Sequence, residues 1–326
     1  MPTPSHAPPA GDLPPFASPS GLRIQATTAA GGSVLEAFYA GYDEAFVLPN
    51  EKESYDGFVA CLALNEGEAY RTLAGRYGGF REFVLTADDP DGTPQIGGAN
   101  FIAFPLLSRT GATLLSINLN YVFVNPQTRQ RGYLRRLVED LPGLALKLLS
   151  RTNPSDIPAG WTDAAGGPAA PTLVFIEQND PYRMTAEAYA TDTRFTGLDQ
   201  ISRIGIWARL GAKIVDFAYV QPPLTTSQDA DDSLVYGVLG HAPAAIDACL
   251  LRGHLERFFA ISVLKGEDPA AEPSARAQLD RLATLCEAGA TIPLLSPRNL
   301  DRAPKPGATT NNLSLREVLR RLGDGR

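Results

Sequence analysis

The sequence predicts a mixed α/β domain followed by a helical C-terminal segment, and two observations lead to this prediction. Along residues 21–240, apolar residues recur with period two in some segments and with a period near 3.6 in others, which are the periods of strands and helices. From Pro243 onward only the helical period remains. We therefore expect a disordered Pro-rich tail over 1–20, an α/β domain over 21–240 and a helical extension over 241–326.

The first half of the domain is divided into strands and helices by local signals. The run Asp-Asp-Pro-Asp-Gly at 88–92 is a strong turn signal between two strand-like segments. Ser33 precedes a helical run of apolar residues and is expected to cap that helix. The expected elements are helices over 33–47 and 54–64 and strands over 21–28, 80–87, 95–104 and 114–124.

The strand expected over 114–124 alternates between apolar and polar residues. Because successive side chains of a strand point to opposite faces, the two sets are expected on different sides of the sheet. Ser116, Asn118 and Asn120 form the polar set. The opposite face is expected to contain Leu115, Ile117, Leu119, Tyr121 and Phe123.

The second half of the domain continues the alternation of helices and strands. The apolar run 173–176 is typical of a strand covered on both faces, and the Gly/Pro/Ala-rich segment 151–171 predicts a surface loop. Asp180 before Pro181 predicts the start of a helix, and Ser-Leu-Arg-Glu at 314–317 is a capping-box signature for a final helix. The remaining expected elements are a helix over 135–149 kinked at 142–143, a helix pair ending at 210–211, and strands over 213–220 and 234–239.

Composition argues against several classes of function. A net charge of −7 and a pI near 5.1 disfavour a nucleic-acid partner, since phosphate binding needs a basic face. No run of eighteen apolar residues and no secretory signal occurs, and neither a G-x-S-x-G motif nor a glycine-rich nucleotide fingerprint is present. The isolated Cys61, Cys249 and Cys286 are typical of reduced thiols in a cytoplasmic protein, and no metal site is expected.

The most informative segment is 121–138, in which a strand runs into a loop and then into a helix. A helix N-terminus presents unpaired backbone N–H groups and a partial positive charge, so this arrangement is suited to bind an anion. Gly132 leaves room for a phosphate to approach the backbone. A solvated basic helix face is the alternative explanation for the charge run. That run consists of Arg129, Arg131, Arg135 and Arg136.

The run 124–134 resembles the motif V-x-P-x-x-R-x-x-G-x-G/A of the GCN5-related N-acetyltransferase (GNAT) superfamily. Leu134 departs from the motif, because the family has Gly or Ala at this position. The order of elements over 22–239 is also similar to that family, and the resemblance implies a mixed, mostly antiparallel sheet flanked by helices. The residues that match the motif are Val124, Pro126, Arg129 and Gly132.

In that family the loop binds the pyrophosphate of coenzyme A, and the preceding strand hydrogen-bonds the pantetheine arm. The resemblance thus implies that acetyl-CoA, or another acyl-CoA, is a cosubstrate of this chain. The residues to which it assigns cofactor binding are Tyr121, Val122, Phe123, Val124, Arg129, Gln130, Arg131, Gly132, Tyr133, Leu134, Arg135 and Asn179.

Acyl transfer to an amine needs a base for the amine and a proton donor for the leaving thiolate. The family's usual donor is a Tyr, but Trp207 stands at that position, and an indole is not a usable acid. Tyr182, Tyr189 or Tyr219 is expected to substitute, or water supplies the proton. Glu177 is the preferred base because it ends an apolar strand, where burial raises a carboxyl pKa; an ion pair with a nearby Arg is the alternative.

Four polar residues are candidates for binding a small-molecule acceptor. Asn118 and Asn120 project from the strand of the motif, and Glu51 and Glu53 lie between the first two expected helices. The family builds its acceptor pocket near those helices, and carboxylates there suit a cationic amine. Contact with solvent alone is the alternative for all four residues.

The sequence therefore predicts an acyl-CoA-dependent N-acyltransferase that modifies an amine of a small-molecule acceptor. A non-catalytic acyl-CoA-binding sensor or assembly module on the same fold is the alternative, because Trp207 replaces the usual acid. No nucleic-acid or membrane partner is expected. The acceptor, the acyl length and the formation of a homodimer stay open.

Overall fold

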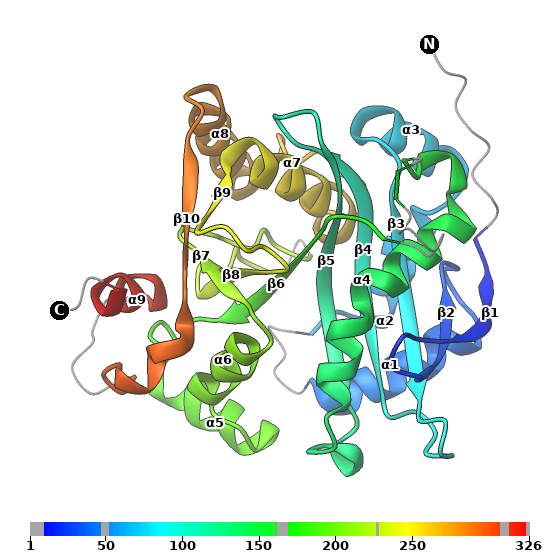
Figure 1. Cartoon of the computed structure of the whole chain (residues 1–326), viewed down its shortest axis with the longest axis horizontal. Helices are drawn as coiled ribbons and strands as arrows, with labels where there is room; N and C mark the ends of the chain where they lie inside the picture. The colour runs from blue at the N-terminus through cyan, green and yellow to red at the C-terminus, as the bar shows by residue number, and fades with distance from the viewer. Residues whose placement is uncertain are drawn as a thin grey trace. The chain divides into compact units, whose positions relative to one another are not determined.

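The computed structural model of the protein describes residues 10–46, 52–158, 160–161, 169–225, 228–306 and 313–323. The chain forms two compact units, which are described separately (Figure 1). Unit 1 comprises Met1–Val174 and Glu256–Asp268, and unit 2 comprises Phe175–Leu255 and Pro269–Arg326. The C-terminal part of the chain thus contributes to both units, whereas the sequence suggests a single division near residue 240.

Unit 1 contains one antiparallel sheet that is flanked by helices. A segment from the C-terminal part of the chain adds the π-helix η4 (Phe259–Val263). In chain order, the other elements are β1 (Asp12–Ala17), β2 (Arg23–Thr27), α1 (Ser33–Ala45), α2 (Tyr55–Ala63), α3 (Gly67–Tyr77), β3 (Arg81–Asp88), β4 (Gly97–Leu107), β5 (Thr113–Val124), η2 (Pro126–Thr128), α4 (Tyr133–Thr152) and η3 (Pro154–Asp156).

The strands of unit 1 follow the order β1-β2-β3-β4-β5, and each neighbouring pair is antiparallel. Helices α1 and α2 cover one face, where Phe38, Tyr42 and Phe58 pack with Val84 and Phe123. Helix α4 packs against β4 and β5 (Figure 1). The predicted mixed, mostly antiparallel sheet flanked by helices is confirmed.

Unit 2 contains a second group of strands in the order β6-β8-β7-β10-β9, together with several helices. Strand β6 begins in unit 1, and helix α7 ends there. The elements are β6 (Thr172–Asn179), α5 (Ala186–Thr196), α6 (Gln200–Arg209), β7 (Lys213–Val215), β8 (Leu234–Leu239), β9 (Ala245–Asp247), α7 (Ala248–Phe258), α8 (Pro273–Glu287), β10 (Thr291–Leu295), η5 (Pro297–Arg302) and α9 (Leu315–Gly323).

Three features of unit 1 differ from the sequence predictions. Strand β1 lies inside the tail 1–20 that composition predicts to be disordered; it pairs with β2, and an edge strand tolerates its prolines. Helix α4 is continuous through Pro142, because buried apolar residues on both sides of the proline anchor it. Helix α1 begins at Ser33 itself, with Gly32 at the N-cap and no side-chain cap bond.

Two predictions for unit 2 are also wrong. Short strands β9 and β10 occur in the segment predicted to be only helical, because strands of three and five residues are too short to show a period. Asp180 does not cap the helix that follows it, since α5 begins at Ala186 with Thr185 at its N-cap. The Asp180 carboxylate instead accepts the backbone N–H of Leu315, at the start of α9. The predicted capping box of α9 is confirmed.

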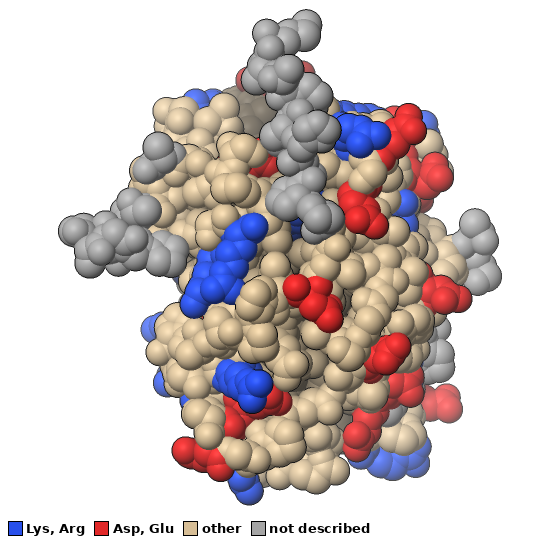
Figure 2. Space-filling model, turned by 90° about the vertical axis from the view of Figure 1, so that its right-hand side faces the viewer, with Lys and Arg blue, Asp and Glu red and all other residues tan. Residues whose placement is uncertain are grey.

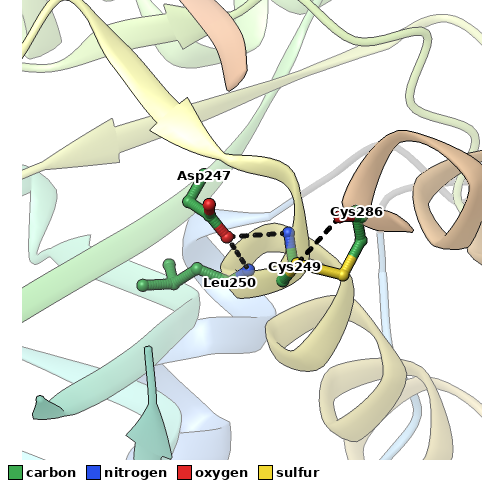
Figure 3. Close-up of a disulfide and its surroundings, with 4 residues drawn as sticks. All are labelled: Asp247, Cys249, Leu250 and Cys286. Carbon is green, nitrogen blue, oxygen red and sulfur yellow. Dashed lines mark hydrogen bonds between the residues drawn. A yellow bond between two sulfur atoms is a disulfide. The ribbon is translucent and has the colours of Figure 1, made fainter. Parts of the chain in front are cut away.

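The cysteines differ from the prediction of three reduced thiols. Cys249 and Cys286 form a disulfide, and only Cys61 is free. Cys249 lies in the first turn of α7, where its backbone N–H and that of Leu250 donate to Asp247 (Figure 3). The fold brings the two Cα atoms to 4.6 Å across 37 residues of sequence, a proximity that no local motif reveals.

The surface of unit 1 mixes charges of both signs. Figure 2 shows the side of this unit that lies at the right of Figure 1, and there Lys and Arg alternate with Asp and Glu over a mostly uncharged surface. Across the described residues, no helix is long and apolar enough to cross a membrane.

Candidate functional site

The loop between β5 and α4 adopts a backbone shape suited to an anion. Residues 129–132 are exposed to solvent. Gln130 and Gly132 have left-handed backbones, with φ of 65° and 81°. Left-handed residues interspersed in a turn direct successive N–H groups into one concavity, which is a frequent anion-binding arrangement. An added Cβ at Gly132 would meet nothing within 4 Å, so the glycine is required by its φ and leaves the loop open.

The backbone N–H groups of this loop are available to a ligand. Among the described residues, none of the N–H groups of 130–135 donates to an acceptor of the protein. The first intrahelical bond of α4 runs from Arg136 to the carbonyl of Gly132, at 3.1 Å. Unpaired N–H groups at the start of a 20-residue helix also lie at the positive end of its dipole. Binding of an anion by these N–H groups stays a prediction.

The arginines near the loop differ in how they are engaged. Arg136 donates to the carbonyl of Ser20 at 2.8 Å and lies 3.7 Å from Asp89. The Tyr133 hydroxyl also donates to Asp89. Arg135 forms an exposed i,i+4 pair with Glu139 at 3.7 Å, which is weak in water. The Arg129 and Arg131 side chains lie within the exposed part of the loop.

Strand β5 leads into this loop and contains a β-bulge. Tyr121 pairs with Asn100 and Leu119 pairs with Phe101, so Asn120 is the extra residue. A bulge shifts the alternation of faces by one residue. Asn118 pairs with Ile102, two residues from Asn100 on the same face of β4, so Tyr121 lies on the Asn118 face. The predicted alternation is therefore wrong beyond Leu119.

Asn118 and Asn120 do not simply face solvent but belong to a polar cluster. Asn118 is buried and donates to Oδ1 of Asn120 at 2.9 Å. Asn120 donates to Glu82 at 2.8 Å and to Oδ1 of Asn100 at 3.0 Å. Ser262 in η4 donates to the second oxygen of Glu82 at 2.8 Å.

The centre of this cluster, Glu82, was missed by the sequence predictions. It is 1% exposed, and burial raises its carboxyl pKa to about 7, while the hydrogen bonds from Ser262, Asn100 and Asn120 lower it. One signal was present, because a charged residue inside the apolar run of β3 is unusual. Ser262, 180 residues further along the chain, gave none.

Glu51 and Glu53, the two acidic residues predicted to bind the acceptor, are not confirmed as free carboxylates. Glu53 is buried and pairs with Lys265 at 2.9 Å, within unit 1. Its charge is therefore balanced by a lysine, which weakens its attraction for a cationic amine. Glu51 lies outside the described residues.

Unit 2 brings together two of the three predicted catalytic residues. The Tyr219 hydroxyl donates to Glu177. Burial raises the pKa of Glu177 to about 7, and the bond from Tyr219 lowers it. Tyr189 is not part of this pair, because its hydroxyl donates to Asp199, the N-cap of α6, at 3.2 Å. Asn179 ends β6 in unit 2.

The chain resembles several solved structures at low sequence identity. No protein-family model and no curated protein matches it. Among solved structures, the ribosomal-protein-S18-alanine N-acetyltransferase of Escherichia coli is 18% identical, with 63% of this chain and 86% of that chain covered and a TM-score of 0.28. A protein of Bordetella pertussis assigned to the GnaT acetyltransferase family is 11% identical, with 70% and 99% covered and a TM-score of 0.28.

A third solved structure is the NatC complex bound to Gag peptide and CoA. It is 13% identical, with 64% of this chain and 91% of that chain covered and a TM-score of 0.26. In the motif of its loop, the chain resembles the GCN5-related N-acetyltransferase superfamily.

Proposed function

We propose that the chain transfers an acyl group from an acyl-CoA to an amine of a small-molecule acceptor. The supporting observation is the loop of residues 130–135, where six consecutive backbone N–H groups have no acceptor among the described residues. A diphosphate has enough acceptor oxygens to bind several of them. Each charge-assisted hydrogen bond contributes about 1.5–3 kcal/mol, so such a cradle holds the pyrophosphate of CoA firmly.

The strand before the loop is proposed to bind the pantetheine arm. Residues Tyr121–Val124 lie between the bulge at Asn120 and the loop, and they are the last residues of β5 that pair with β4. An extended backbone of this kind offers N–H and carbonyl groups to the amides of pantetheine. Bound in this way, the acyl-CoA supplies the thioester that is to be cleaved.

The reaction itself requires one proton acceptor and one proton donor. The amine nitrogen attacks the thioester carbonyl, the new C–N bond forms, the C–S bond breaks, and the departing sulfur takes a proton. Glu177 is proposed to accept the proton of the amine, because a carboxyl with a pKa of about 7 is partly ionised near neutral pH. Its partner Tyr219 is proposed as the donor to the thiolate.

Thiol release from acetyl-CoA tests this function, with a panel of small amines as acceptors. Wild-type protein is expected to release CoA faster when a suitable amine is present. Gly132→Glu is expected to lose CoA binding, because its carboxylate repels the phosphates. Gly132→Ala is the matched control, since both variants strain the same backbone (φ 81°) but only one adds charge.

Two results would contradict the proposal. Unchanged CoA affinity in Gly132→Glu, measured by calorimetry, would show that the cofactor binds elsewhere. Tight CoA binding without amine-dependent release would instead support the non-catalytic acyl-CoA-binding module.

A further inference from the structure

The cluster around Glu82 has a hydrogen-bond pattern that suits an ionised carboxylate. Oε1 accepts from Asn100 at 2.7 Å and from Asn120 at 2.8 Å, and Oε2 accepts from Ser262 at 2.8 Å. All three partners donate, and an ionised carboxylate has acceptors but no hydrogen to offer. The cluster is thus arranged around a negative charge that is almost completely buried.

The same network fixes the side chain of Asn120 completely. Its two N–H groups go to Glu82 and to Oδ1 of Asn100, and its own Oδ1 accepts from Asn118 at 2.9 Å. The second N–H of Asn100 donates to the carbonyl of Phe83 at 3.0 Å, which sets the orientation of that amide. Neither amide can flip without breaking hydrogen bonds to buried partners.

Asn120 is also the extra residue of the β5 bulge. A bulged residue lacks a partner on the neighbouring strand, so its conformation depends on contacts of its side chain. The residues that follow it, Tyr121–Val124, are those proposed to bind the pantetheine arm. The charge on Glu82 therefore influences the position of Asn120, which directly precedes the residues proposed to bind pantetheine.

We infer that Glu82 is a positioning residue for acyl transfer: as a carboxylate it holds Asn120 and the β5 bulge in the geometry that aligns the thioester. This inference rests on the proposed function. When Glu82 takes up a proton, it loses its charge-assisted bonds to the two amides, and Asn120 is held less firmly. Acyl transfer is then expected to slow, while the loop of residues 130–135 still binds CoA.

The charged and titratable groups near the Glu82 carboxyl lie on three segments of unit 1. Lys265, from the same segment as Ser262, favours the charged form, and Lys265 itself pairs with Glu53. Burial raises the pKa of the Cys61 thiol in α2, and the charge of Glu82 raises it further. Burial is the largest influence on Glu82 and brings its pKa to about 7, so protonation changes within the neutral range.

The first test needs neither a variant nor turnover. In ¹⁵N-labelled protein without ligand, the side-chain NH₂ resonances of Asn100 and Asn120 are followed by NMR as pH is raised from about 5.5 to 8.5. Both are expected to shift together with one midpoint. Resonances that stay constant, or that titrate with different midpoints, would overturn the inference.

The second test separates this role from cofactor binding. Glu82→Gln is expected to lower kcat about tenfold at about pH 8 and to leave only the rise with pH that Glu177 causes, while the Kd for CoA changes less than about threefold; tenfold corresponds to about 1.4 kcal/mol. Glu68→Gln, at an exposed position of α3, is the matched control and should leave kcat and its pH profile unchanged.

A double-mutant cycle decides whether Glu82 acts through Asn120. Asn120→Ala should slow transfer as much as Glu82→Gln, and the double variant should be no slower than either single variant. Additive losses would overturn the inference, because Glu82 would then act independently. If wild-type protein shows no acyl transfer, the proposed function fails, and the NMR titration still decides whether Glu82 controls Asn120.

Discussion

At the scale of single residues, the loop of residues 130–135, proposed to bind the phosphates of CoA, depends on two unusual backbone conformations. Gly132 adopts φ 81° at no steric cost, whereas Gln130 adopts φ 65° against the preference of a residue with a Cβ. Non-glycine residues with a left-handed backbone cluster at functional sites, where the surroundings compensate for the strain. The sequence indicates Gly132, but nothing in it indicates the conformation of Gln130.

The buried Glu82 carboxyl predicts a pH-dependent stability. Its pKa is raised from 4.5 to about 7, so the folded state binds the proton more tightly than the unfolded state. The resulting stabilisation is fully present below about pH 4.5 and is lost as pH rises through about 7. From the size of the shift, the loss is about 3 kcal/mol.

Urea unfolding at about pH 5 and at about pH 8 measures this effect in wild-type protein and in Glu82→Gln. The difference in unfolding free energy between the two proteins should change with pH by about 3 kcal/mol, with wild type relatively weaker at the higher pH. Glu177 has a similarly raised pKa in both proteins, so its contribution cancels in this difference. A difference that stays constant with pH would contradict the burial of an ionisable Glu82.

At the scale of elements, the sequence predicts those whose pattern is local. Helices α1 and α2 and strands β2 to β6 occur where the apolar periods indicate them, because each buries one face or both faces against a neighbour. Strand β1 was missed because it depends on pairing with β2. The bulge at Asn120 was missed because it is defined by the pairing between two strands and not by either strand alone.

Helix α4 allows a stability prediction at the position where the sequence indicates a kink. Gly143 lies inside the helix, and an added Cβ would approach Cγ of Pro19 at 3.5 Å, an ordinary contact. Gly143→Ala should therefore stabilise unit 1 by about 0.5–1 kcal/mol in chemical unfolding. Gly75→Ala in α3, where a Cβ meets nothing within 4 Å, is the matched control with the same expected gain. Destabilisation by Gly143→Ala alone would show that α4 packs more tightly against Pro19 than the 3.5 Å separation implies.

At the scale of the whole molecule, the C-terminal part of the chain is more than an appendage. Its segment Glu256–Asp268 belongs to unit 1, and it supplies Ser262 to Glu82 and Lys265 to Glu53. These contacts join residues that lie 180 or more positions apart, so the sequence predicted two members of the polar cluster, Asn118 and Asn120, but not its centre.

The disulfide closes a covalent loop that includes this segment. Because Cys249 and Cys286 are separated by 37 residues, their bond restricts the unfolded chain, and its reduction should lower the unfolding free energy by about 2–4 kcal/mol. Thermal unfolding with and without dithiothreitol measures the effect. The double variant Cys249→Ser/Cys286→Ser should not respond to the reductant. An equal response in both proteins would contradict the disulfide.

The central claim is that the backbone N–H groups of 130–135 bind the diphosphate of CoA. The most direct measurement is an NMR titration of ¹⁵N-labelled protein with CoA, followed at these six amides. We expect their resonances to shift strongly and with a common Kd, and to remain unshifted in Gly132→Glu. Shifts confined to other parts of the chain, with these six amides unchanged at saturating CoA, would contradict the account.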